Sequence, residues 1–527
     1  MRYKLLYNFH VRKRPHRRAR FVYLVTRIMR FDRRTCSQAR LTRDARFDGR
    51  FFIGVRSTRI YCRPICPVRA AKEENVTYFP TAAAAAEAGY RPCMRCRPES
   101  SPGTPAWSGT SATVGRALRL ISEGGVEDEG IEKLAARLGI GSRQLRRLFL
   151  QHLGATPSAV IKTRRLHFAK KLIDETALSF SEIAHASGFG SVRRFNSAFR
   201  KTYGRTPTEI RRFSHSHRSL KPTDEYEFRL SFRPPFQWRA FLDYLAKRAI
   251  PGVESVDADS YRRTIVFNGC SGSLCVALEA SHPALRVRIS LADPRWLFQI
   301  IEKVRHLFDL TADPREISAH LSRDSLLAER VKKHSGLRIP GSWDGFELAV
   351  RAILGQQISV AGASTLAGRM VERFGVKICD TGPLTHLFPK SQQLAEANLE
   401  QIGLPKARAE TVRTLARNVA DGRLNFDAVQ NTEEFRMRLL EIPGIGDWSA
   451  QYIAMRALND TDAFPSGDLG LMRAMSLRNA RDLTHRAEAW RPWRAYAAMY
   501  LWQTNGAKAQ SKRVGGQLKV QPSMFAE

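Results

Sequence analysis

The residues best suited to chemistry in this chain are four cysteines, Cys62, Cys66, Cys93 and Cys96. They form a Cys-x3-Cys pair and a Cys-x2-Cys pair, which is the arrangement of two chelating pairs brought together by one loop. Four thiolates suit a tetrahedral site, and we therefore predict one Zn²⁺ ion bound by all four. Arginines flank both pairs, and a guanidinium beside metal thiolates favours an anionic partner such as phosphate. A purely structural zinc site is the alternative that the spacing leaves open.

The run from Asp48 to Cys62 reads Asp-Gly-Arg-Phe-Phe-Ile-Gly-Val-Arg-Ser-Thr-Arg-Ile-Tyr-Cys. It closely resembles the N-terminal zinc domain of Ada, the bacterial sensor of alkylated DNA. The resemblance implies that Cys62 accepts a methyl group irreversibly from a DNA methylphosphotriester. We expect Arg69 and Arg91 to hold phosphates once methylation has reduced the negative charge of the thiolates. The Pro-Cys-His-Arg site of Ada's second acceptor module is missing, because Pro92-Cys93-Met94-Arg95 belongs to the predicted zinc site.

A second chemical centre is predicted near the C-terminus. Residues 440–450 read Leu-Glu-Ile-Pro-Gly-Ile-Gly-Asp-Trp-Ser-Ala, the form of a helix-hairpin-helix whose Gly444 and Gly446 let the backbone approach a DNA phosphate. Residues 464–471 follow as Phe-Pro-Ser-Gly-Asp-Leu-Gly-Leu. This order resembles the helix-hairpin-helix DNA glycosylases, and the resemblance implies that Asp468 is the catalytic carboxylate. A plain turn between helices, and a helix N-cap at Asp468, are the alternatives.

The segment Phe232-Arg-Pro-Pro-Phe-Gln-Trp238 looks like the start of an AlkA-type 3-methyladenine DNA glycosylase. Cleavage of an N-glycosidic bond passes through an oxocarbenium-like state that a carboxylate stabilises, and aromatic faces attract a flipped cationic base. The resemblance places four aromatic residues in the base pocket, with ordinary core packing as the alternative for each: Trp448, Tyr452, Trp502 and Tyr244. Residues 351–360 resemble the strand-intercalating loop of this family, with Gln357 as a polar wedge.

Two missing features narrow the expected activity. Glycosylases that also nick the backbone carry a Schiff-base lysine just after the hairpin glycines, where this chain has Trp448. No cysteine follows Cys379, so the iron–sulfur cluster of some relatives is not expected. We therefore expect a monofunctional 3-methyladenine DNA glycosylase that also accepts one methyl group per molecule at Cys62, as a stoichiometric methyltransferase.

The composition agrees with a DNA-binding protein of several domains. The chain has 527 residues, 86 Lys and Arg against 50 Asp and Glu, and a formal net charge of +36. Such a charge favours a polyanionic partner, here double-stranded DNA, both alkylated and promoter DNA. No run of about 20 apolar residues is present, so no membrane partner is expected. Reduced, metal-binding thiols favour a bacterial cytoplasm.

The elements that position these residues begin with an internal repeat. Leu145, Phe149, Leu153-Gly154 and Thr156-Pro157 recur as Phe195, Phe199, Tyr203-Gly204 and Thr206-Pro207. Before each copy we expect a helix, a glycine turn and a second helix, capped by Ser142 and by Ser191 respectively. The pattern resembles the AraC-type activators, which implies promoter binding and contact with RNA polymerase. Four basic residues of the second helices are expected to reach the major groove: Arg143, Arg146, Arg193 and Arg194. A generic helical bundle is the alternative.

The expected fold is multidomain α+β. It comprises a zinc-binding α/β domain at residues 36–100, an all-α AraC-type double helix-turn-helix at 113–213, an α+β AlkA N-terminal domain at 222–302 and an all-α helix-hairpin-helix glycosylase domain at 303–510. Residues 1–35 form a basic extension, in which Met29 is an expected alternative start, and residues 511–527 form a tail. Residues 99–112 and 214–223 read as linkers.

Two other functional classes stay open at this point. One is a transcription regulator with a degenerate glycosylase tail, and the other is a glycosylase whose front half only adds affinity for DNA. Asp468 argues against the first, and the acceptor-like motif at Cys62 argues against the second.

Overall fold

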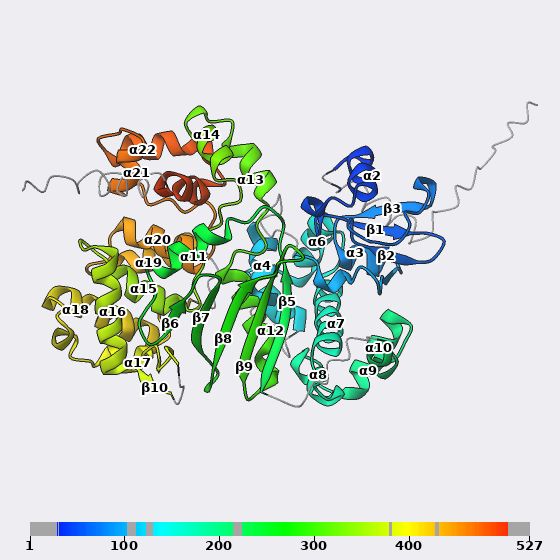
Figure 1. Ribbon diagram of the computed structural model, residues 1–527, viewed down its shortest axis with the longest axis horizontal. Coiled ribbons are helices and arrows are strands. Elements are labelled where there is room, and N and C mark those ends of the chain that lie inside the picture. The colour runs from blue at the N-terminus through cyan, green and yellow to red at the C-terminus, as the bar shows by residue number, and fades with distance from the viewer. Residues whose placement is uncertain are drawn as a thin grey trace, which may run out of the picture.

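The computed structural model describes residues 29, 31–102, 112–122, 130–213, 224–378, 382–426 and 432–503. The expected tail, nearly all of the first 30 residues, most of both linkers and Cys379 lie outside these ranges. A five-stranded sheet stands in the middle of the molecule, with the zinc and helix-turn-helix half on one side and the glycosylase helices on the other (Figure 1). No helix within the described ranges combines the length and the apolar character that a bilayer span requires.

The N-terminal domain is a small α/β unit. Helix α2 (Arg33–Leu41) begins at the side-chain cap of Asp32 and so crosses the expected boundary at residue 36. The sheet has the order β3-β1-β2-β4. Its strands are β1 (Phe52–Val55), β2 (Ile60–Cys62), β3 (Val76–Phe79) and β4 (Arg91–Pro92), and helix α3 (Ala82–Glu87) packs on it.

The double helix-turn-helix forms as the repeat predicts. Its helices are α4 (Ala112–Ser122), α5 (Gly130–Arg137), α6 (Ser142–Leu153), α7 (Pro157–Glu175), α8 (Phe180–Ala186), α9 (Val192–Tyr203) and α10 (Pro207–Phe213). Gly154 and Gly204 end α6 and α9 in the left-handed conformation, with φ of 66° and 71°. Ser191 caps α9, but the expected cap at Ser142 is wrong, because α6 begins one residue after Gly141, which offers no side-chain cap.

The central sheet is antiparallel throughout, in the order β5-β9-β8-β7-β6. The strands are β5 (Glu225–Ser231), β6 (Glu254–Val256), β7 (Ser260–Phe267), β8 (Cys270–Leu278) and β9 (Ala284–Leu291). Helix α11 (Trp238–Ala246) lies between β5 and β6 in the chain. Helix α12 (Leu297–Leu307) packs its buried face into the same core and therefore runs across the expected boundary between residues 302 and 303.

The C-terminal part is helical except for a short ribbon, β10 (Val376–Lys377) and β11 (His386–Leu387), which sequence reasoning missed. Its helices are α13 (Pro314–Leu321), α14 (Ser325–Lys333), α15 (Gly345–Leu354), α16 (Val360–Phe374), α17 (Ser391–Ala395), α18 (Lys406–Ala420), α19 (Thr432–Leu440), α20 (Asp447–Ala457), α21 (Leu469–Ala474) and α22 (Ala480–Ala487), and the described chain ends in a helix over residues 494–503.

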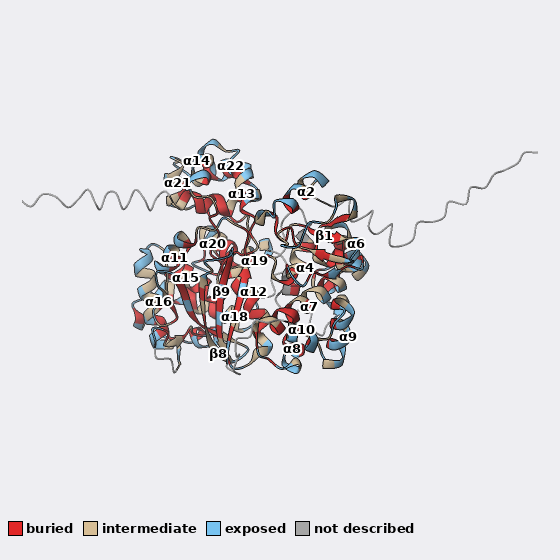
Figure 2. Cartoon of the chain, turned by 45° about the vertical axis from the view of Figure 1, so that its right-hand side comes forward, coloured by how far each residue is buried: buried red, intermediate tan, exposed pale blue. Residues whose placement is uncertain are grey.

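The hydrophobic cores do not follow the repeat in the sequence. The first helix-turn-helix unit shares a core with Ala83 of the zinc domain, whereas Phe195 and Phe199 of the second unit belong to the core of the central sheet. Buried residues concentrate in the sheet and on the inner faces of the helices, and exposed residues face outward (Figure 2). The domain with the four cysteines, the double helix-turn-helix and the C-terminal half are therefore packed into one body.

Candidate active site and metal centre

The four cysteines meet at the edge where β2 pairs with β4. This pairing is parallel, with Tyr61 opposite Pro92, and the Cys93 N–H donates to the Tyr61 carbonyl at 2.9 Å. Cys62 and Cys93 therefore leave adjacent strand ends, and all four Sγ atoms lie within 4.8 Å of one another. Tetrahedral zinc–thiolate bonds of about 2.3 Å place sulfurs about 3.8 Å apart, so this donor set fits Zn²⁺.

The four thiols differ in exposure. Cys93 and Cys96 are 7% and 6% exposed, whereas Cys62 and Cys66 are only partly buried. A cavity of about 1090 Å³ opens over Cys62, Cys66 and Cys93. Its lining is rich in arginine and includes both predicted phosphate contacts, Arg69 and Arg91, as well as Arg43, Arg95 and Arg205. The accessible side of the cluster is therefore strongly cationic, as an anionic partner requires.

One flanking arginine has a structural role instead. Arg63 is 6% exposed, and its guanidinium binds the buried Asp48 carboxylate and donates to the Cys96 carbonyl at 3.0 Å. Its backbone N–H donates to the Cys96 Sγ at 3.3 Å. Arg63 therefore holds the two halves of the cysteine cluster together and is not available to a phosphate.

The cysteine cluster is also connected to the helix-turn-helix domain. The Tyr61 hydroxyl, next to Cys62 in the chain, lies 2.8 Å from Nε2 of His167 on α7. Arg91 reaches over the end of α9, close enough that a side chain at Gly204 would meet its guanidinium. The predicted methyl acceptor thus lies directly against the domain that is predicted to bind promoter DNA.

The predicted major-groove residues are free to meet DNA. Arg143 and Arg146 on α6, and Arg193 and Arg194 on α9, are all exposed, whereas the apolar repeat positions of the same helices are buried. Each helix therefore buries one face and presents a basic face to solvent.

The predicted hairpin lies between α19 and α20. Gly444 has φ of 93°, and a Cβ atom there would stand 2.2 Å from Oγ1 of Thr411 on α18, so only glycine fits. Gly446 is the N-cap of α20 and has no heavy atom within 4 Å of a built Cβ position. Gly446 and Asp447 at this helix start are exposed, and the first backbone N–H groups of a helix suit a phosphate.

The predicted wedge lies beside this hairpin. Gln357 is exposed at the tip of the loop between α15 and α16, with φ of 57°. Its neighbour Gln356 donates from Nε2 to the Gly444 carbonyl at 2.9 Å and to Ser449 Oγ at 3.2 Å. Sequence reasoning missed Gln356, which ties the predicted wedge loop to the predicted hairpin, so that the two lie side by side.

Asp468 is the N-cap of α21, and its Oδ1 accepts the Leu471 N–H at 2.9 Å. It is also the point where two predicted pocket residues meet. The Trp502 indole N–H donates to Oδ1 and the Trp448 indole N–H donates to Oδ2, both at 3.0 Å. The carboxylate is partly buried, and these bonds fix its plane. One acceptor position on Oδ2 is left for a substrate or a water molecule.

The other two predicted pocket residues complete an aromatic cluster. The Tyr452 ring stacks on Trp448 with centroids 5.2 Å apart and planes 7° from parallel, and the Tyr244 hydroxyl lies 3.2 Å from the Tyr452 hydroxyl. All four aromatic side chains are only partly buried, in contrast to the core residue Trp490, which is 1% exposed. The cluster therefore has accessible aromatic faces beside Asp468, which ordinary core packing does not provide.

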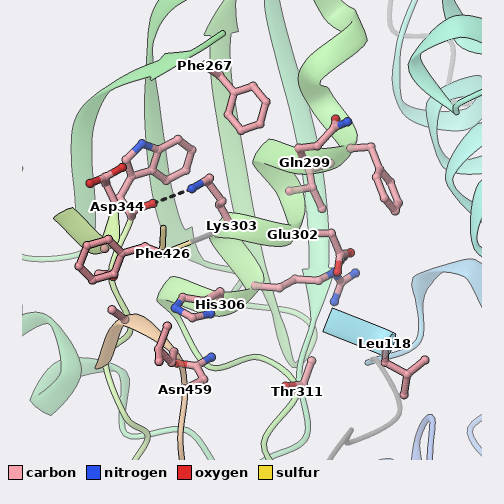
Figure 3. A pocket seen from close by; sticks show the side chains of 18 of the residues that line it. Leu118, Phe267, Gln299, Glu302, Lys303, His306, Thr311, Asp344, Phe426 and Asn459 are labelled. Atoms are coloured by element: carbon pink, nitrogen blue, oxygen red, sulfur yellow. Dashed lines mark hydrogen bonds and ion pairs between the residues drawn. The ribbon is translucent and has the colours of Figure 1, made fainter. Parts of the chain in front are cut away.

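A larger cavity, about 1370 Å³, lies elsewhere, between the two halves of the molecule. Figure 3 shows Phe267, Lys303 and Asp344 among the side chains around it, and the Lys303 Nζ donates to the Trp343 carbonyl at 3.2 Å. None of the predicted catalytic, metal-binding or base-pocket residues lines this cavity. The residues predicted to carry the chemistry therefore lie away from this cavity, in the cysteine cluster and the Asp468 cluster.

Four protein families match successive parts of the chain. They are the metal binding domain of Ada at residues 35–99, a helix-turn-helix domain at 134–212, the AlkA N-terminal domain at 227–344 and the HhH-GPD superfamily of base excision DNA repair proteins at 350–491. The order and identity of these domains confirm the predicted fold class.

Some relatives match most of the chain, and others match only its C-terminal or its N-terminal part. A "probable bifunctional transcriptional activator/DNA repair enzyme AlkA" from Mycobacterium tuberculosis is 42% identical over 90% of this chain and 97% of its own length. DNA-3-methyladenine glycosylase 2 of Escherichia coli is 33% identical over 53% of this chain and 98% of its own length. The bifunctional transcriptional activator/DNA repair enzyme Ada of Escherichia coli is 32% identical over 33% of this chain and 48% of its own length.

The four-cysteine cluster, the paired helix-turn-helix units and the carboxylate beside the hairpin thus occur together in one chain, and the Mycobacterium tuberculosis relative matches that chain over 97% of its own length. The chain belongs to the family of bifunctional transcriptional activator and DNA repair enzymes of the AlkA type.

Proposed function

We propose that the C-terminal half removes 3-methyladenine and similar alkylated bases from DNA, with Asp468 as the catalytic carboxylate. The observation that carries this proposal is the pair of indole N–H bonds, 3.0 Å each, that fix the Asp468 carboxylate beside accessible aromatic faces. A flipped alkylated base would stack on Trp448 and Tyr452 and place its sugar near Oδ2.

The chemistry needs few groups. A 3-methylated purine in DNA is already cationic and leaves without a general acid. As the N-glycosidic bond breaks, its electron pair goes to the base, and positive charge develops on the sugar, where the Asp468 carboxylate stabilises it. A water molecule held at the free acceptor position of Oδ2 then attacks the sugar carbon and passes its proton to that carboxylate.

The enzyme is proposed to be monofunctional. Trp448 occupies the first turn of α20, where an amine nucleophile would have to stand, and its indole is committed to Asp468. Abasic sites should therefore accumulate without strand cleavage, and borohydride should trap no covalent complex with DNA. A trapped complex would show that some lysine of the chain forms an imine.

The direct test of the excision proposal is Asp468→Asn. Excision of 3-methyladenine should fall at least ~10²-fold, the range of a positioned acid–base group, whereas affinity for undamaged DNA should persist. Asp447→Asn is the matched control, because that carboxylate lies on α20 but pairs with Arg436 in solvent. A folded Asp468→Asn protein with unchanged turnover would remove the assignment of Asp468, whereas a wild-type protein that excises no alkylated base would favour a regulator with a degenerate glycosylase tail.

For the N-terminal half we propose a methylphosphotriester sensor, with one Zn²⁺ held by Cys62, Cys66, Cys93 and Cys96. Such an ion would keep the thiols deprotonated at neutral pH. The Cys62 Sγ would attack the methyl carbon of the triester, the carbon–oxygen bond would break toward the phosphate, and a thioether and a phosphodiester would result. No base in the site can reverse a thioether, so each molecule should react once.

Cys62 is favoured as the acceptor by its exposure. It is partly buried and opens to the arginine-lined cavity, whereas Cys93 and Cys96 are buried; Cys66 is likewise only partly buried, and only the resemblance to Ada favours Cys62 over it. Methylation would lower the formal charge of the four-thiolate zinc centre from −2 to −1, so that Arg69 and Arg91 hold phosphates more strongly. One charge near several phosphates is worth on the order of 1–2 kcal/mol at an effective dielectric near 20, or roughly tenfold in affinity.

We propose that this gain lets the two basic helices hold a promoter and contact RNA polymerase. Intact-mass analysis after exposure to methylated DNA should find one added methyl, located on Cys62, and Cys62→Ser should lose inducible promoter binding. Cys36→Ser is the control, because that buried thiol lies outside the cluster. A methyl on another cysteine would contradict Cys62 as the acceptor. An unchanged promoter affinity after methylation would contradict the sensor and favour a front half that only adds affinity for DNA.

A further inference from the structure

The floor of the aromatic cluster holds a charged group that the excision mechanism does not use. Arg456 is 4% exposed and lies one turn after Tyr452 on α20. Its Nη1 donates to the Tyr452 hydroxyl at 2.6 Å, and its other nitrogens donate to the carbonyls of Pro340 and Gly341 at 2.7 and 3.1 Å. Within the described ranges, no carboxylate oxygen lies within 4.0 Å of this guanidinium.

A buried guanidinium without a carboxylate is expensive, and here it stands beside a site proposed for a cationic base. Both facts would disfavour the arrangement unless some neighbouring group becomes negative. The acidic group that is hydrogen-bonded to Arg456 is the Tyr452 hydroxyl, whereas the Asp468 carboxylate is hydrogen-bonded to the two indoles and Tyr244 presents its ring to Arg456.

The titratable and charged groups around Tyr452 come from four elements. They are Tyr244 on α11 and Arg248 in the turn just after it, Arg351 on α15, Arg456 on α20 and Asp468 at the start of α21. The Arg248 guanidinium lies 3.8 Å from the Tyr244 ring centroid, and Arg351 is already paired with Glu254 and Glu347. The surroundings of the Tyr452 hydroxyl are therefore predominantly cationic.

The two phenols respond to these surroundings in opposite directions. Burial by itself would raise the pKa of Tyr452, but the guanidinium groups of Arg456 and Arg248 outweigh it, and the pKa falls to about 7. Burial raises the pKa of Tyr244, which keeps its proton. The cluster thus has one phenol that ionises near neutral pH and one that does not.

We propose that the Tyr452 hydroxyl is the group that lets this pocket select cationic alkylated purines over neutral bases. As a phenolate paired with Arg456 it leaves the pocket floor without net charge, and a flipped cationic base is accepted. With the hydroxyl protonated, Arg456 leaves the floor positive, and a cationic base is repelled. This inference rests on the excision function proposed above.

The phenolate itself can be measured without DNA. Titration of the full-length protein by near-ultraviolet difference absorbance should show one of its 13 tyrosines ionising near pH 7 in the wild type. This step should be missing in Tyr452→Phe, retained in Tyr244→Phe, and shifted to higher pH in Arg456→Gln. A wild-type protein without any tyrosinate below pH 9 would overturn the proposal, even if excision proceeds as expected.

Selectivity is tested by single-turnover excision between pH 5.5 and 8.5. The wild-type rate on 3-methyladenine should rise about tenfold through neutral pH, the effect of one charge facing a stacked cation. Tyr452→Phe keeps the aromatic ring and should remain at the low-pH level throughout. On hypoxanthine, a neutral purine, the substitution should change the rate less than threefold. An equal loss on both bases would show that Tyr452 acts only through packing and would overturn the proposal.

Failure of this proposal and failure of the excision function give different results. If Asp468 is not the catalytic carboxylate, Asp468→Asn stays active whatever Tyr452 does. If Tyr452 is not the selective group, Asp468→Asn is inactive while Tyr452→Phe keeps the wild-type pH profile. Arg456→Lys preserves the charge and should retain the rise with pH more fully than Arg456→Gln, and equal profiles for the two would count against the pair.

Discussion

The contact between the zinc domain and the glycosylase domain makes a prediction that the structure quantifies. Arg50 Nε lies 2.7 Å from Asp313 Oδ2, and the side chains are 11% and 1% exposed. Asp313 also caps α13, through a bond from the Glu316 N–H at 3.2 Å. Arg50→Ala would therefore leave a buried carboxylate at the start of α13 without its ion pair.

The size of the effect follows from what remains around Asp313. Breaking a buried ion pair from one side typically costs about 3–5 kcal/mol. The buried guanidinium of Arg233 still attracts the Asp313 carboxylate and offsets part of this loss. We expect the local stability of the docked α13 to fall by about 2–3 kcal/mol. This corresponds to a roughly 30- to 150-fold larger equilibrium constant for local opening.

Hydrogen–deuterium exchange of peptides covering α13 measures this opening directly. Arg46→Ala is the matched control, because Arg46 forms an ion pair with Asp44 in the same domain but is 54% exposed, and such pairs contribute about 0–1 kcal/mol. A change below threefold at α13 in Arg50→Ala, or an equal change in Arg46→Ala, would refute the view that Arg50 clamps the two domains together.

Three further predictions concern the hairpin, a buried carboxyl and the metal. Gly444→Ala should destabilise the hairpin by about 2–4 kcal/mol, because the added Cβ would clash with Thr411, and it should weaken DNA binding measured by fluorescence anisotropy. Gly446→Ala is the control, because a Cβ there meets open space, and this variant should keep the wild-type thermal stability. Equal destabilisation by the two substitutions would contradict the prediction. Burial raises the pKa of Asp309 to about 6, above its unfolded value of about 4, so the protonated form stabilises the fold at low pH and this contribution of about 3 kcal/mol is lost as pH rises through 6. The free energy of unfolding by urea should therefore rise for Asp309→Asn relative to the wild type between pH 4 and pH 7. A difference in this free energy that stays constant with pH would argue against the prediction. Removal of zinc with a chelator should release one ion per chain and expose the loop at Cys62–Cys66 to proteolysis, while 3-methyladenine excision persists; loss of excision would show that the metal also supports the glycosylase.

Several features of the fold follow from short stretches of sequence. The two members of each cysteine pair lie within a few residues of each other, Gly444 adopts a positive φ that its turn requires, and the apolar repeat positions fall on one face of each helix. Such patterns are local, because spacing along a helix or turn fixes which side chains share a face. The expected cap of α6, Ser142, is wrong by one residue, because the sequence pattern does not tell whether the helix starts after Gly141 or after Ser142.

The partners that complete each site come from distant parts of the chain, and only the tertiary structure identifies them. Arg63 is committed to Asp48, Gln356 to the hairpin and Arg456 to Tyr452, although sequence alone marks them as ordinary polar residues. The two copies of the helix-turn-helix repeat look equivalent in sequence, yet one packs on the zinc domain and the other on the central sheet. The periodicity of a sequence shows which face of a helix is apolar. Which surface of the molecule buries that face depends on how all apolar faces of the chain pack together, and this is determined only in the tertiary structure.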